Sequence, residues 1–165
     1  MTDTHITLVG AGRMGSALAG GWLKAGLAGK IDIVDPTPVE TVQAWADDES
    51  VRLNPAPKPS DVLVVAVKPQ VFGQLAGEIA SRVDPDTRVL SIMAGVTLET
   101  LEAKLGTSNV ARAMPNTPGL VGKGVTILCT KPGTNDSAIS ELKALLEPLG
   151  QVEGPIGEDL LPAAT

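Results

Sequence analysis

Ile6-Thr-Leu-Val-Gly-Ala-Gly-Arg-Met-Gly15 joins a short apolar run to a glycine-rich turn, and a segment of helical periodicity follows it. In that segment Met14, Leu18 and Trp22 recur at four-residue spacing, and Gly26 follows as a stop signal. A strand, a Gly-x-Gly-x-x-Gly turn and a helix in this order are typical of a dinucleotide-binding unit. The first glycine permits the tight turn, the second leaves room for a pyrophosphate, and the third lets helix and strand pack closely. The stretch therefore predicts a site that binds dinucleotide phosphates at the N-terminus of the helix.

The remainder of the chain continues this alternation of apolar runs and helical segments. The expected strands are 6–9, 31–34, 51–53, 62–67, 89–93, 110–114 and 125–129, with 151–153 as a weak eighth. The expected helices are 13–25, a helix with Thr37 as its N-cap and Glu40 completing a capping box, and three helices with periodic apolar residues within 71–79, 98–105 and 139–149. The run 62–67 does not alternate, which predicts a central strand covered on both faces. We expect an α/β protein of the Rossmann type, with a doubly wound, mostly parallel sheet and helices on both faces.

Composition excludes several classes of function. The 165 residues are 43% hydrophobic, with a formal net charge of −6 and an aromatic fraction of 2%. The net negative charge would repel nucleic acid and anionic membranes, and the chain offers few aromatic rings on which bases could stack, so we expect neither as a partner. With one cysteine and one histidine, the chain is expected to form neither a disulfide nor a metal site. The polar residues 1–5 lack the features of an export signal. We expect a cytoplasmic protein with one core and no membrane span.

Asp35 ends the second expected strand, 20 residues after Gly15. A carboxylate at this place accepts hydrogen bonds from the adenosine ribose in NAD enzymes. It would repel the 2′-phosphate of NADP, and residues 36–39 contain no Arg or Lys to compensate. Asp is also a common turn residue ahead of a proline such as Pro36, so a purely structural role remains open. The residues favour NADH over NADPH.

Three later loops fall after the fourth, fifth and sixth expected strands, whose carboxyl ends face one crevice. They read Ala66-Val-Lys-Pro-Gln70, Ile92-Met-Ala-Gly-Val96 and Arg112-Ala-Met-Pro-Asn-Thr-Pro-Gly119. Together with the glycine turn, and in the same order along the whole chain, these loops resemble the pyrroline-5-carboxylate reductases, which catalyse the last step of proline biosynthesis. Many members of that family place a small polar residue at the position of Asp35 and use NADPH, so the resemblance favours NADPH.

The resemblance implies a dinucleotide-binding domain over residues 1–153. It implies that residues 154–165 begin the connection to a helical domain that forms the dimer and helps to hold the substrate. That helical domain is absent from the 165 residues. We therefore expect a homo-oligomer for a protein that contains it, and a monomer or weak association for this chain.

The resemblance also implies roles for individual residues. Asn116 and Thr117 would lie nearest the substrate. The cofactor-binding residues would be Gly10, Ala11, Gly12, Arg13, Met14 and Gly15 at the pyrophosphate, Asp35 and Asn54 near the adenosine, Ala66, Val67, Lys68 and Pro69 beside the nicotinamide ribose, and Met93, Ala94 and Gly95 under the nicotinamide. Read from the residues alone, Lys68 fits either a phosphate contact or an exposed lysine, and Asn116 fits a plain turn.

The side chains that a carbonyl reductase uses as proton donors are scarce in this chain. Tyrosine is absent, His5 precedes the first expected strand and fits a surface residue near a terminus, and Cys129 fits a small buried residue within a strand. An imine is basic enough to bring its own proton, so its reduction requires mainly positioning and exclusion of water. The favoured hypothesis is reduction of 1-pyrroline-5-carboxylate to L-proline by NADH or NADPH. The alternative is a non-catalytic module that binds NAD(H).

Overall fold

The computed structural model describes residues 3–47 and 49–161, which form one eight-stranded sheet in the order β3-β2-β1-β4-β5-β6-β7-β8. The six strands β1 to β6 are mutually parallel, β7 runs antiparallel to β6, and β8 is parallel to β7. The strands are β1 His5–Val9, β2 Lys30–Val34, β3 Arg52–Leu53, β4 Val62–Val65, β5 Arg88–Ser91, β6 Val110–Pro115, β7 Gly124–Thr130 and β8 Gly150–Ile156. This is the Rossmann order extended by two strands, so the predicted fold class is confirmed.

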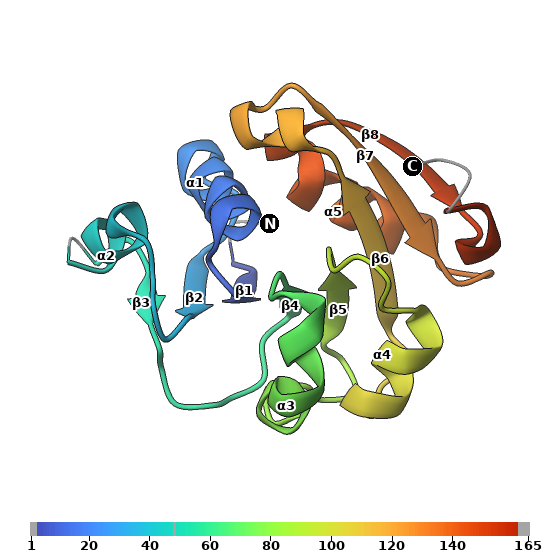
Figure 1. The fold of residues 1–165 in the computed structure, drawn as a ribbon, viewed down its shortest axis with the longest axis horizontal. Helices are drawn as coiled ribbons and strands as arrows, with labels where there is room; N and C mark the ends of the chain where they lie inside the picture. Colours follow the sequence, from blue (N-terminus) through green and yellow to red (C-terminus); the bar gives the residue numbers. More distant parts are fainter. Residues whose placement is uncertain (1–2, 48, 162–165) are drawn as a thin grey trace.

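Helices cover both faces of the sheet (Figure 1). The α-helices are α1 Arg13–Ala25, α2 Glu40–Asp47, α3 Pro69–Ala80, α4 Leu98–Leu105 and α5 Asp136–Leu146, and the short 3-10 helices are η1 Thr117–Val121, η2 Glu147–Leu149 and η3 Glu158–Leu160. In Figure 1, α1 and α5 lie on one side of the sheet, α3 and α4 lie on the other, and α2 lies beyond the β3 edge. None of the helices in the described ranges combines the length and the apolar character needed to cross a membrane.

Each face of the sheet has its own apolar core. On one face, Leu18 and Trp22 of α1 pack with Leu142 and Leu145 of α5, and the Trp22 indole N–H donates to the Leu145 carbonyl at 2.8 Å. On the other face, the apolar residues of α3 and α4 pack against β4 and β5. All four residues of β4 are fully buried, as the unalternating run predicts for a central strand.

The predicted boundaries are confirmed where a residue at the boundary, such as a glycine, itself ends the element. The helix α1 has the predicted bounds, and both α1 and α4 end at glycines in the left-handed region, Gly26 and Gly106. Three predictions are wrong in their boundaries. The strand predicted to reach residue 67 ends at Val65, the one predicted to reach residue 93 ends at Ser91, and Leu149 lies in η2 beyond the end of α5.

The predicted capping box before α2 is also wrong. The helix begins at Glu40, and the carbonyl of Val39 accepts from the amides of Val42 and Gln43, so the N-cap position is Val39 rather than Thr37. The amide of Thr37 donates instead to Asp35 Oδ1 at 2.8 Å, which holds residues 35–37 in a turn. Thr37 therefore belongs to the loop after β2, three residues ahead of the helix.

The C-terminal strand β8 is longer than its weak sequence pattern predicts. It pairs with β7 from Gly124↔Gly150 to Cys129↔Ile156, so it passes residue 153, the predicted end of the dinucleotide-binding domain. Residues 154–161 continue as the end of β8 and as η3, whereas residues 162–165 of the predicted connection lie outside the described residues.

Candidate functional site

The strand order reverses between β1 and β4, and the loops that follow these two strands leave in opposite directions. A cleft of about 820 Å³ opens at this point. Its wall includes five of the residues predicted to bind cofactor phosphates or ribose, and two predicted near the adenosine: Gly10, Gly12, Ala66, Val67, Lys68, Asp35 and Asn54. Open α/β sheets bind their ligands at such a reversal, beyond the carboxyl ends of the strands.

The three glycines of the turn have three different environments. Gly10 has φ +91°, and a β-carbon there would lie 2.8 Å from the backbone of Ala66, so the turn requires glycine. At Gly15 a β-carbon would lie 2.2 Å from the carbonyl oxygen of Gly10, because helix and turn touch. A β-carbon at Gly12 would meet nothing within 4 Å. The space above Gly12 is therefore a cradle that a side chain would fill, which fits the approach of a pyrophosphate.

The N-terminus of α1 lies at this cradle. Gly12 is its N-cap residue and makes no side-chain capping bond, and the first turn carries no acidic residue. Lys68 occupies the same position at the start of α3, again without a side-chain capping bond. By contrast, the hydroxyl of Thr97 caps α4 and the amide of Asn135 caps α5. The amides at the start of α1 therefore have no side-chain cap and are available to an anion, and Lys68, whose side chain is exposed, lines the same cleft.

Asp35 is tied to the glycine turn and to its own loop. Its Oδ2 accepts from the amide of Ala11 at 2.7 Å, and its Oδ1 accepts from the amide of Thr37. Asn54 brackets Asp35 by accepting from its amide and donating to its carbonyl, both at 2.9 Å. Asn54 adopts φ +49°, a conformation that Asn tolerates better than most residues. The structure is therefore compatible with a structural role and with a ribose-binding role for Asp35, because its carboxylate stabilises the turn and the residue also lines the cleft.

The far wall of the cleft comes from α3 and is not predicted from the sequence. It includes the exposed side chains of Val71, Gln74 and Glu78 and the half-buried side chain of Leu75. The local sign of this wall is that α3 starts at Pro69, directly after Lys68, so its first turns leave from the crevice rim. Glu78 adds an acid to this wall, and its carboxylate forms a salt bridge with Arg82 at 3.6 Å.

The loops predicted under the nicotinamide and substrate lie farther along the same edge of the sheet. Met93 is buried in the α3 and α4 core, whereas Ala94 and Gly95 are exposed. Asn116 is exposed, and its Oδ1 accepts from the amide of Val125 at 3.0 Å, so its carbonyl oxygen closes the loop before β7. Thr117 is exposed at the start of η1.

Two other predicted pyrophosphate residues lie to the side of the 820 Å³ cleft. Arg13 lines a separate hollow of about 430 Å³ between α1, α2 and η1, together with Trp45 and Leu120. Met14 is half-buried and packs against the core of the α1 face. The predicted residue Pro69 is the first residue of α3.

His5 and Cys129 lie away from the crevice. His5 is the first residue of β1, at the amino ends of the strands, and its ring is half-buried and bonded to Asp32 at 2.8 Å, so its assignment as a surface residue ahead of the strand is wrong. Burial favours the protonated form of Asp32, but hydrogen bonds from Arg52 and His5 outweigh it and lower the pKa of that carboxyl. Cys129 is buried in β7, where burial raises the pKa of its thiol, as expected for a packing residue.

Comparison with known proteins gives three findings. Residues 5–95 match the model of the family described as NADP oxidoreductase coenzyme F420-dependent. The pyrroline-5-carboxylate reductase of Escherichia coli is 38% identical over 131 residues, an alignment that covers 75% of this chain and 48% of the relative. The chain thus spans about half the length of the curated relatives it matches.

Solved structures with the same fold include two reductases. The pyrroline-5-carboxylate reductase of Coxiella burnetii superposes with a TM-score of 0.84 at 24% identity, over 96% of this chain and 61% of that chain. The pyrroline carboxylate reductase of Plasmodium falciparum, solved with NADP bound, gives a TM-score of 0.81 at 26% identity, over 100% of this chain and 62% of that chain.

Proposed function

Because the chain belongs to the family described as NADP oxidoreductase coenzyme F420-dependent, we propose that it is the cofactor-binding part of a reductase that converts 1-pyrroline-5-carboxylate to L-proline. The observation that carries the substrate assignment is the name shared by its curated relatives, of which the Escherichia coli reductase is 38% identical over 131 residues. The order of the four loops along one sheet edge, from the glycine turn to Asn116, supports the same assignment.

The residues present fit a dinucleotide. The open space at Gly12, the uncapped amides of α1 and the ammonium of Lys68 would hold the pyrophosphate and the neighbouring ribose. Asp35 and Asn54 would lie at the adenosine, with the α3 wall on its other side. Met93, Ala94 and Gly95 would support the nicotinamide, and Asn116 and Thr117 would lie nearest the substrate.

When bound, the reduced nicotinamide supplies a hydride to the imine carbon. The part of this chain in that chemistry is to position the ring and to limit the access of water. A protonated imine already carries the proton that a ketone would require from the protein, so the reaction is compatible with a site edge formed by Ala94, Gly95, Asn116 and Thr117.

For the cofactor, we propose NADH as the preferred reductant. The carboxylate of Asp35 lines the adenosine side of the cleft, where a 2′-phosphate would add a like charge. Thr37 and Pro36, which line the same side, supply no cation. Relatives that bind NADP, such as the Plasmodium falciparum protein, are the basis for the opposite expectation. We also propose a cytoplasmic location, a small-molecule imine as substrate, and a homo-oligomer for a protein that contains the helical domain.

The test is imine-dependent oxidation of NADH and of NADPH, measured in parallel at 340 nm with 1-pyrroline-5-carboxylate and the 165-residue chain. We expect turnover that requires the imine and is faster with NADH. Binding of either reductant without any turnover would instead favour the non-catalytic module for this chain. Failure to bind either reductant would contradict the proposed site.

A further inference from the structure

Arg112 is a charged residue in the middle of an apolar strand. It lies on β6 between Ala111 and Ala113, and its side chain is 6% exposed. A buried guanidinium requires a partner, since an uncompensated charge there is strongly destabilising. The partner is Glu158 of η3, whose Oε1 accepts from Arg112 Nη1, although 46 residues separate the two in the sequence.

The same oxygen of Glu158 makes a second contact. It accepts from the amide of Leu98 at 2.9 Å, and Leu98 is the first residue of α4. The Glu158 side chain is 28% exposed, so the two contacts lie at the rim of the core. Glu158 therefore links three elements, β6, α4 and the segment after β8. We name this group, Arg112, Glu158 and the Leu98 amide, the Glu158 latch.

The latch lies at one end of the loop proposed to support the nicotinamide. That loop leaves β5 at Ser91 and enters α4 at Leu98, and Gly95 within it has φ +74°. At its first end, Ser91 Oγ accepts from the amide of Met93 at 3.2 Å. In the sheet, Ser91 is the register partner of Arg112. Arg112 therefore lies beside the start of the loop, and through Glu158 it holds the end of the loop.

The adenosine half of the crevice is built from other elements. Its wall is formed by residues of β1, β2 and α3 and of the loops that follow β1, β2, β3 and β4, and it contains none of the latch residues. Loss of the latch would thus loosen the end of the loop at Leu98, while Met93 stays packed in the core and the glycine turn and Asp35 stay in place.

We propose that Glu158 is a positioning residue for the nicotinamide half of the dinucleotide. It acts through Leu98 and Arg112 on the loop of Met93, Ala94 and Gly95, and it makes no contact with the reacting atoms. This inference rests on the proposed function, since it takes that loop as the nicotinamide support. It also makes the segment after β8 a part of the cofactor site.

The test compares two ligands that differ only in the nicotinamide. NADH carries it, whereas ADP-ribose has the same adenosine, pyrophosphate and second ribose without the ring. Dissociation constants for both are measured by titration calorimetry on the 165-residue chain and on its variants Glu158→Ala and Glu158→Gln. We expect Glu158→Ala to weaken NADH about tenfold, because charged hydrogen bonds hold the loop, and to leave ADP-ribose within about twofold. Glu158→Gln keeps an oxygen for the Leu98 amide and should recover part of the NADH affinity.

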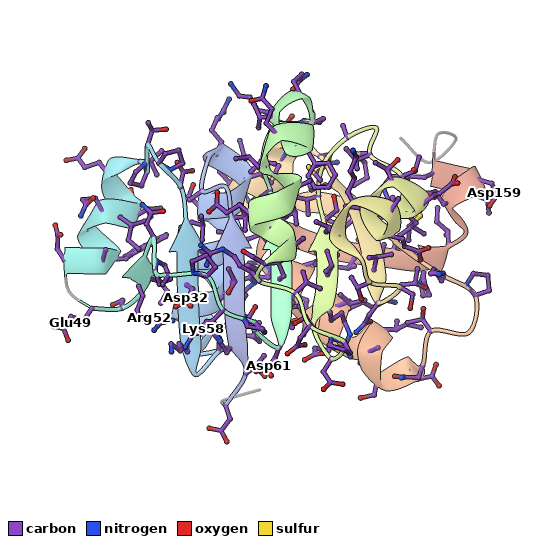
Figure 2. The ribbon with its side chains drawn as sticks, turned by 90° about the horizontal axis from the view of Figure 1, so that it is seen from below. Asp32, Glu49, Arg52, Lys58, Asp61 and Asp159 are labelled. Carbon is purple, nitrogen blue, oxygen red and sulfur yellow. The ribbon has the colours of Figure 1, made fainter. Side chains whose placement is uncertain are left out.

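Asp159→Asn is the matched control. Asp159 is the adjacent acid, is exposed, and points outward at the end of the molecule away from Asp32 and Arg52 (Figure 2). This variant should bind both ligands as the unmodified chain does. The emission of bound NADH gives a second readout, since it reports the surroundings of the ring: Glu158→Ala should shift it and Asp159→Asn should not.

The possible results separate the two proposals. Equal weakening of NADH and ADP-ribose in both Glu158 variants would overturn the positioning role and leave Glu158 as a general stabiliser of the fold. Unchanged binding of both ligands would overturn it as well. If the unmodified chain binds neither ligand, the proposed function itself fails, a result that is independent of the variants.

Discussion

Gly12 and Gly15 lie in one turn, yet the space around them differs completely. Gly15 is buried against the carbonyl of Gly10, whereas Gly12 faces open space. Alanine substitutions at these two positions therefore test two quantities independently: the stability of the fold at Gly15 and the affinity for the dinucleotide at Gly12.

We expect Gly12→Ala to fold normally and to bind NADH at least about tenfold more weakly, because its methyl group occupies the cradle for the pyrophosphate. Its φ of −67° is allowed for alanine, so the free energy of unfolding should change by less than about 1 kcal/mol. Urea unfolding and NADH titration check both parts. Unchanged NADH affinity would contradict the assignment of this turn to the phosphates.

Gly15→Ala should show the reverse order of effects. Its β-carbon would lie 2.2 Å from Gly10 O, so turn and helix must separate. We expect the free energy of unfolding to fall by about 2 to 4 kcal/mol, in the range of overpacked sites. The midpoint of urea unfolding measures this loss, and a midpoint equal to that of Gly12→Ala would contradict the close approach.

Asp35 makes a prediction about cofactor preference. Asp35→Ser removes the negative charge together with the acceptor for the Ala11 amide. We expect NADH to bind about tenfold more weakly and the ratio of NADPH to NADH affinity to rise. Asp35→Asn is the control, since it removes the charge but keeps an oxygen for the turn. Titration of both cofactors would contradict the assignment if their affinity ratio were the same in all three proteins.

Among the elements, the strands β1, β2 and β3 are linked near their amino ends by ion pairs to one buried carboxylate. Asp32 is 1% exposed and accepts from His5 on one side and from Arg52 on the other. Figure 2 shows Arg52 and Lys58 gathered beside Asp32, far from the carboxyl ends that form the crevice. This group holds the short edge strand β3 onto β2.

Asp32→Asn should therefore lower the free energy of unfolding at neutral pH by about 2 kcal/mol, less than for a fully buried pair because Arg52 is 43% exposed. The pKa of Asp32 is lower in the folded chain than its ordinary value of 3.8, so its contribution is complete above that pH. It is lost as the pH falls below 3.8 towards the folded pKa, and the two proteins should converge there. Urea unfolding from pH 3 to pH 7 measures the gap, with the exposed Glu49→Gln as control; a constant gap would contradict the role of the charge.

Local and nonlocal signals explain which elements the sequence predicts. Gly26 and Gly106 end helices because glycine readily adopts the left-handed conformation, which is a local signal. The apolar run of β4 is also local, because its composition alone predicts a buried strand. The start of α2 is misplaced because the Thr37 amide bonds to Asp35, a choice that a capping pattern does not encode. β8 is underestimated because its alternating, half-buried residues gain their order from pairing with β7.

The candidate site divides in the same way. The glycine turn and the loop of Lys68 follow from motifs, and the structure places them on one cleft. The α3 wall and the Glu158 latch depend on which elements pack together, so the sequence offers only the hint of an arginine within an apolar strand. The predicted binding roles of Met93, Ala94, Gly95, Asn116 and Thr117 stay predictions.

For the whole molecule, the resemblance to pyrroline-5-carboxylate reductases is confirmed by relatives of that name that align with most of the chain. Within a chain that spans about half of these relatives, the two cores on the two faces of the sheet bury all four residues of the central strand β4.

We expect the 165-residue chain to sediment as a monomer at micromolar concentration. The large apolar side chains exposed among the described residues are few and come from different parts of the chain, and they are Val39, Val71, Val121, Val125 and Leu160. Analytical ultracentrifugation measures the association. A tight dimer at micromolar concentration would contradict this expectation and would direct attention to η1 and β7, which carry Val121 and Val125.

The close approach of Gly10 to Ala66 also sets an order of events during synthesis. The glycine turn leaves the ribosome early, but its neighbour β4 follows only after β2, α2 and β3 have been made. Because parallel strands must wait for such a crossover, the nascent turn has no second wall and no ligand cleft until then. A nucleotide therefore acts on this protein as a late stabiliser of a nearly finished sheet and cannot serve as a template on which the first half of the chain folds.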